Sequence, residues 1–115
     1  MSDRMYPSTT PELDRKRRKL SVETATAFQD FSQKVFADGA LPAKIKQIIA
    51  VAVAHVTQCP YCIRGHTQAA LKAGATEQEI MEAIWVAAEM RAGGAYAHSA
   101  QAIDTMLHAH DATSG

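Results

Sequence analysis

The chain has 115 residues, with 12 basic and 12 acidic side chains, so its formal net charge is zero. This length fits a single domain, residues 1–115, and the balanced charge argues against nucleic acid or an anionic membrane as the main partner, since both need a basic excess. Hydrophobic residues make up 47% of the chain, and many of them are alanines, which add little apolar area when buried. We therefore expect apolar helix faces to be covered by another subunit.

Targeting and membrane signals are missing from the sequence. The N-terminal segment, residues 1–9, is polar and has no signal-peptide pattern, and the longest apolar run, Ile48–Ala54, is far too short to span a bilayer. The two cysteines lie three residues apart, whereas a structural disulfide framework uses more cysteines and longer loops. We expect a cytoplasmic protein whose cysteines carry redox or metal chemistry.

The first half of the chain predicts three helices. Thr10 and Pro11 begin the first one, which carries five consecutive basic residues, Arg15–Lys19. A nucleic-acid patch is the alternative for this run, but a solvated or partner-facing surface fits the neutral chain better. Ser21 caps a second helix that runs to about Ala37, and a third runs from Pro42 to about Thr57. The apolar stripe of the third helix predicts burial and consists of Ile45, Ile48, Ile49, Ala52 and Val56.

The second half continues the helical pattern. A fourth helix begins near Cys59-Pro60 and ends at Gly74, and Thr76 begins a fifth with a capping box. The fifth helix has two apolar faces, which predict an oligomer interface. Gly93-Gly94 either breaks this helix or lets a neighbour approach, and a last helical stretch covers about Tyr96–His108, before a frayed tail, 110–115. The prediction is an all-α, compact domain of about six helices without strands.

The chemistry concentrates in the segment Cys59-Pro60-Tyr61-Cys62-Ile63-Arg64-Gly65-His66. Both sulfurs lie in or beside a first helical turn, where free amide groups and the helix dipole favour a thiolate. Helical spacing places Cys59, Cys62 and His66 on one stripe, so the imidazole can exchange a proton with a thiol and the sulfurs can close a reversible disulfide. Exposure favours Cys59 as the attacking sulfur, while proximity to His66 favours Cys62.

Other proteins use a Cys-x-x-Cys pair in different ways. A thioredoxin fold needs a strand before the motif, and a c-type haem site needs histidine directly after the second cysteine, so neither fits. A zinc site would need a fourth ligand beside the two cysteines and His66, which His98 or His55 could supply. Two ordinary buried thiols beside a surface histidine are the simplest alternative. We expect no cofactor and no resident metal.

The motif and its flanking helices resemble the alkyl hydroperoxidase D-like branch of the carboxymuconolactone decarboxylase family. The resemblance covers about residues 40–105 and rests on the cysteine motif, the helix segment 44–50, residues 69–79 and Gly93-Gly94. It implies trimers or hexamers that reduce hydroperoxides by cycling the two cysteines, with lipoyl groups or small thiol proteins as reductant. Carboxymuconolactone decarboxylases themselves lack the cysteine pair, so the presence of the pair in this chain disfavours lactone decarboxylation.

One position departs from the family pattern. A relay glutamate is expected twelve residues before the first cysteine, and Gln47 stands there, which can hydrogen-bond but cannot act as a base. Glu89 is a candidate substitute, its alternative being a solvated position or an ion pair with Arg91. His98 could approach the site or be a surface residue, and His55 could join the relay or complement its helix dipole. Tyr61 replaces a histidine found in a relative, and His108 and His110 are expected to have no role.

Two functions from different classes remain at this stage. The first is a thiol-dependent peroxidase or disulfide oxidoreductase whose substrate is a hydroperoxide or disulfide and whose reductant is a dithiol or lipoyl group. The candidate catalytic residues are Cys59, Cys62, His66, Gln47, Glu89 and His98. The second is a non-enzymatic redox sensor or zinc-binding module with the homo-oligomer as its output.

Overall fold

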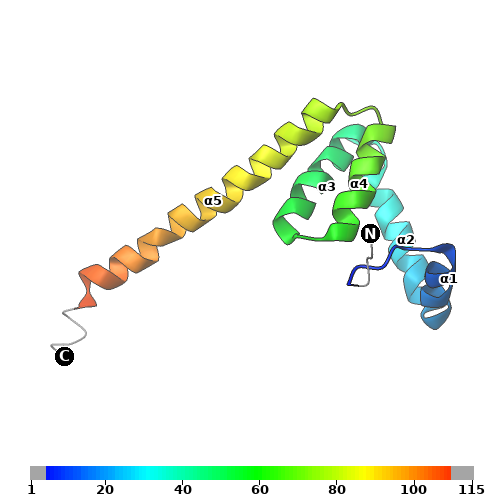
Figure 1. Cartoon of the computed structure of the whole chain (residues 1–115), viewed down its shortest axis with the longest axis horizontal. Coiled ribbons are helices and arrows are strands. Elements are labelled where there is room, and N and C mark those ends of the chain that lie inside the picture. Colours follow the sequence, from blue (N-terminus) through cyan, green and yellow to red (C-terminus); the bar gives the residue numbers. More distant parts are fainter. Residues whose placement is uncertain (1–4, 110–115) are drawn as a thin grey trace.

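The computed structural model describes residues 5–109 and is all-helical over that range (Figure 1). Thr10 caps the first helix through its hydroxyl, Ser21 precedes the second, and Thr76 and Glu79 form the expected capping box. The all-α prediction is therefore confirmed. The five helices are α1 (Pro11–Leu20), α2 (Val22–Phe36), α3 (Ala43–Thr57), α4 (Pro60–Lys72) and α5 (Glu77–Leu107).

The core lies where α3 and α4 pack together and the first part of α5 crosses them (Figure 1). Val51 and Ala70 are completely buried, and the cluster is completed by Ala75, just before α5, and by Ile80 in the first turn of α5. The small alanines allow close helix packing, but they bury little apolar area, so this core alone stabilises the chain modestly.

Three local devices set the helix directions around the site. Asp38 accepts the free amide proton of Ala43 at 2.7 Å and thereby begins α3. Gln58 takes a left-handed conformation, φ 60°, and ends α3. Gly74 has φ +100°, where a side chain would be strained. The Ala75 amide then donates a hydrogen bond to the Ala70 carbonyl at 2.9 Å. The turns at Gln58 and Gly74 reverse the chain at both ends of α4.

The glycine pair does not break α5, so the separate last helix expected from Tyr96 onward is wrong. α5 is continuous over 31 residues, and the described chain has five helices instead of about six. Each glycine costs a helix only about 1 kcal/mol, and the long flanking helical segments on both sides outweigh that cost. A Cβ on Gly93 would lie 3.3 Å from the Glu89 carboxylate, so this glycine leaves room for that side chain.

The chain is also more extended than the compact domain that we expected. Its radius of gyration is 20.5 Å, against roughly 13 Å for a globular chain of this length. The reason is that the second half of α5 projects away from the other helices (Figure 1). Tyr96 and Met106 on this half are 82% and 67% exposed, and Phe28 and Phe31 of α2 are exposed as well.

Within residues 5–109, none of the helices is both long enough and apolar enough to cross a membrane. Residues 1–4 of the polar N-terminal segment, the tail 110–115 and His110 lie outside the described residues.

Candidate functional site

The cysteine pair stands at the N-terminus of α4, as the sequence predicted. The connection from α3 consists only of Gln58 and Cys59, and Cys59 is the N-cap residue of α4 with Pro60 in the first turn. The Cys62 amide donates to the Cys59 sulfur at 3.3 Å, and both thiols are free and half-buried. Cys59 therefore takes the capping position that Ser or Asp usually fills, and its sulfur faces the positive end of the helix.

The two thiols differ in acidity. Hydrogen bonds from the Cys62 side chain and amide lower the pKa of Cys59 below its ordinary value of 9.0. The same thiol–thiol hydrogen bond, together with burial, raises the pKa of Cys62. The thiolate is consequently favoured on Cys59, with the Cys62 thiol as its donor.

His66 is held from two other helices. Its Nδ1 lies 2.7 Å from Oε1 of Gln47 on α3, and its ring stacks on Phe36 of α2 with centroids 5.1 Å apart and planes 27° apart. An amide oxygen can only accept, so Nδ1 carries the proton and Nε2 of a neutral imidazole keeps a lone pair. Gln47 was among the predicted catalytic residues, and the fold brings it into direct contact with His66.

A mainly apolar cavity of about 400 Å³ opens beside Cys62 and His66. Its walls come from α2, α3 and α4, and Lys46 is the one permanently charged side chain among them. The lining residues are Val35, Phe36, Lys46, Ile49, Ala50, Val53, Ala54, Thr57, Cys62 and His66. Because it combines a thiol and an imidazole with apolar walls, this cavity is the best candidate for a substrate site.

A second, more polar cleft of about 850 Å³ reaches Cys62 from the side of α1 and α2. Tyr61 borders this cleft, and Tyr6 packs edge-on against Tyr61 with centroids 6.2 Å apart. Asp14 at its margin accepts hydrogen bonds from Arg17 and Arg18, both at 2.9 Å. Two members of the basic run are thus paired within α1.

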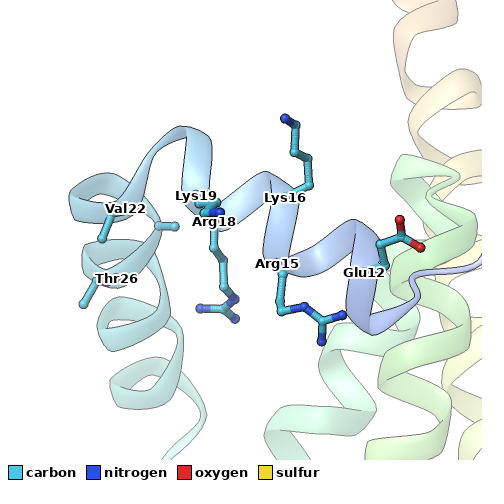
Figure 2. A pocket seen from close by; sticks show the side chains of 8 residues that line it. Glu12, Arg15, Lys16, Arg18, Lys19, Val22 and Thr26 are labelled. Atoms are coloured by element: carbon cyan, nitrogen blue, oxygen red, sulfur yellow. The ribbon is translucent and has the colours of Figure 1, made fainter.

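The other three residues of the basic run, together with Arg18 again, border a separate groove of about 820 Å³ between α1 and α2 (Figure 2). Arg15 and Arg18 extend to one side of α1 and Lys16 to the other, which fits the expected solvated surface. The lining contains no cysteine or histidine and consists of Glu12, Arg15, Lys16, Arg18, Lys19, Val22, Ala25 and Thr26. This groove is therefore separate from the cysteine chemistry.

None of the other candidate relay residues lines the cavity beside Cys62 and His66. Glu89 is exposed beside Gly93, and Arg91 donates to the Val56 carbonyl at 2.7 Å. His98 is exposed on the projecting half of α5 and bonds its own helix at Gly94, 2.7 Å away. His55 likewise bonds the Val51 carbonyl at 2.8 Å. No three His, Cys, Asp or Glu side chains gather as a metal site within residues 5–109.

Sequence reasoning missed Phe36 and Lys46. Phe36 lies near the end of the second helix, and nothing in the sequence connects it with His66, thirty positions later. Lys46 belongs to a segment that we used only for its family resemblance. Both roles arise from the packing of α2 against α3.

Similarity to known proteins identifies the family of this chain. A model of the carboxymuconolactone decarboxylase family matches residues 23–105, which include the cysteine pair and His66. A Paracoccus denitrificans protein named "Uncharacterized protein 4 in cox locus" is 55% identical over 104 residues, 90% of this chain and 92% of that protein.

Two solved structures have the same fold. A carboxymuconolactone decarboxylase family protein from Legionella pneumophila superposes with a TM-score of 0.64 at 36% identity, over 81% of this chain and 83% of that one. A carboxymuconolactone decarboxylase family protein from Thermotoga maritima, described as "possibly involved in antioxidative response", superposes with a TM-score of 0.57 at 23% identity. The superposition covers 79% of this chain and 94% of that one. The family that the motif suggested is confirmed: the chain belongs to the carboxymuconolactone decarboxylase family.

Proposed function

We propose that this protein is a thiol-dependent peroxidase that reduces hydroperoxides by reversible oxidation of Cys59 and Cys62. The observation that carries the proposal is the cavity lined by Cys62 and His66, with the more acidic Cys59 thiol directly behind Cys62. A nucleophile, a proton carrier and a second thiol are the three groups that such a reaction needs.

The first step takes place at Cys62, because this sulfur lines the cavity. Its proton passes to Nε2 of His66, and the thiolate attacks the terminal oxygen of the hydroperoxide. A sulfur–oxygen bond forms, the oxygen–oxygen bond breaks, and the alkoxide takes the proton from His66 and leaves as an alcohol. Cys62 is then a sulfenic acid.

Cys59 resolves this intermediate. Its thiolate attacks the sulfenic sulfur, a disulfide bond forms, and the leaving hydroxide takes a proton from solvent, which balances the proton that Cys59 released when it ionised. Overall, two thiols lose two electrons and two protons, and the hydroperoxide becomes an alcohol and water. An external dithiol, of small-molecule, protein or lipoyl type, returns the electrons by thiol–disulfide exchange. A reducing compartment such as the cytoplasm suits this cycle.

We further propose that the working form is a homo-oligomer, a trimer or hexamer as the family resemblance implies. The support is the apolar surface that this single chain leaves open on α2 and on the projecting half of α5. Exposed apolar side chains that gather on a helix face are typical of protein–protein contact surfaces.

The proposed function is tested by intact mass before and after a near-stoichiometric dose of cumene hydroperoxide. We expect a prompt loss of two hydrogen masses per chain that dithiothreitol reverses, and continued turnover when the dithiol is in excess. A reversible disulfide with very slow peroxide reaction would instead indicate a redox sensor. Unreacted thiols with one metal ion per chain in a native spectrum would indicate a zinc module.

A further inference from the structure

The walls of the cavity beside Cys62 are apolar and accessible. Ile49 and Val53 on α3 are 46% and 51% exposed, and Val35 of α2 faces the same cavity. No other part of the described chain covers these side chains. A ligand with an apolar body would therefore remove them from water, and this is a favourable change.

The permanent charge in the cavity lining is positive and comes from one side chain. Lys46 is the only permanently charged side chain in the lining, and the neighbouring Gln47 is neutral. The Lys46 ammonium group donates to the Ala37 carbonyl at 2.7 Å, which occupies one of its three protons, and no carboxylate within residues 5–109 pairs with it. Among the described residues, two protons of this ammonium group are therefore left for a ligand in the apolar cavity.

The order of these groups follows from α3. Lys46, Ile49, Val53 and Thr57 recur every three or four residues, so they form one stripe, and at about 1.5 Å per residue it is roughly 16 Å long. His66 lies level with the Lys46 end, because it contacts Gln47. Cys62 is one helical turn farther along α4, toward the connection with α3. An extended chain that starts at Lys46 therefore passes His66 before it reaches Cys62.

We propose that this cavity binds the apolar chain of a carboxylate-bearing hydroperoxide, such as a fatty-acid hydroperoxide, with Lys46 holding the carboxylate. The inference rests on the proposed function, because Cys62 is the sulfur that the peroxide must reach. The hydroperoxide group then lies several carbons from the carboxylate, because Cys62 lies about one helical turn beyond the level of Lys46 and His66. Charge complementarity at Lys46 sets the direction in which the chain enters.

The test compares one fatty-acid hydroperoxide as free acid and as methyl ester, below its critical micelle concentration, with dithiothreitol as reductant. We expect kcat/KM to favour the acid by about tenfold, the size of one charge-assisted hydrogen bond. Lys46→Met should bring the acid-to-ester ratio close to one, and Lys46→Arg should keep the preference. Lys44→Met is the matched control, since Lys44 pairs with Glu79 at 3.2 Å and does not line the cavity.

A separate binding measurement distinguishes the two proposals. Dodecanoate and its methyl ester are titrated into the reduced wild-type protein, and dodecanoate should bind more tightly through Lys46. Equal rates for acid and ester in an active enzyme would overturn the inference and leave the peroxidase proposal standing. Lys46-dependent binding without turnover of any hydroperoxide would support the site and overturn the peroxidase function. Absence of dodecanoate binding would overturn the proposed binding site. This result is expected if a second copy of the chain fills the cavity.

Discussion

Oε1 of Gln47 accepts a hydrogen bond from Nδ1 of His66 over 2.7 Å, and this contact joins α3 to α4 across the site. It assigns the ring tautomer and leaves Nε2 as the proton acceptor. A neutral amide at this position orients the imidazole, but it adds no negative charge to the cavity.

The first prediction concerns this contact. Gln47→Leu removes the acceptor, so we expect the peroxidase rate to fall by about tenfold, a modest part of what acid–base catalysis contributes. Gln47→Glu should raise the rate with a neutral hydroperoxide, because a carboxylate stabilises the imidazolium that forms during proton transfer. Steady-state rates with cumene hydroperoxide decide both, with the exposed Gln68→Leu on α4 as control. An unchanged rate in both variants would mean that another group moves the proton.

The second prediction separates the roles of the sulfurs. Cys62→Ser should abolish disulfide formation and turnover, whereas Cys59→Ser should stop at a sulfenic acid on Cys62 that dimedone traps. Peptide mass spectrometry after one dose of hydroperoxide locates the adduct. Full turnover by Cys62→Ser would contradict the paired-thiol model, and a trapped adduct on Cys59 in that variant would reverse the assigned roles.

The third prediction follows from the lowered pKa of Cys59. Because the thiolate is the nucleophile, iodoacetamide should label Cys59 before Cys62 as the pH rises toward 9.0. The depressed pKa also means that folding stability gained from this group is present above the unfolded pKa and is lost as the pH falls through the folded pKa. Cys62→Ala removes the donor thiol, so labelling of Cys59 should shift to higher pH. Simultaneous labelling of both thiols in the wild type would argue against this asymmetry.

The fourth prediction concerns Phe36, which stacks on His66. Phe36→Leu keeps an apolar side chain but removes the ring, so we expect a loss of severalfold in kcat with little change in thermal stability. Phe31→Leu on the same helix provides the control, because Phe31 is exposed. Equal effects of the two substitutions would show that the ring contributes only general packing.

The fifth prediction is assembly above a dimer, measured by light scattering. Met106→Glu places a charge on the exposed apolar half of α5 and should shift the protein toward smaller species. A monomeric wild-type protein would contradict the interpretation of the two apolar faces of α5.

Local signals were sufficient for much of the architecture. Thr10, Thr76 and Gly74 mark helix ends through capping and backbone conformation, and these effects act within a few residues. The stripe of Cys59, Cys62 and His66 is also local, since it lies on one helix. Its contact with Gln47 was expected only through the family resemblance.

Features that depend on packing between distant residues could not be predicted from the sequence in this way. The Gly93-Gly94 pair resembles a helix break, but α5 continues through it, since two weak helix formers do not outweigh the long helix around them. The stacking of Phe36 and the place of Lys46 depend on how α2 meets α3, and no periodicity reports that. Glu89 and His98 looked suitable by residue type, but their helix carries both to an exposed surface.

The cap made by Cys59 connects helix stability to redox poise. In the reduced protein, its sulfur accepts the Cys62 amide proton and carries the favoured thiolate at the positive end of α4. In the disulfide, that sulfur has no negative charge and is a weaker acceptor, so α4 loses part of its cap, a contribution that is typically about 1 kcal/mol. The first turn of α4 therefore stabilises the dithiol over the disulfide and raises the reduction potential of the pair. In the proposed cycle, an external dithiol would therefore reduce the oxidised protein more easily.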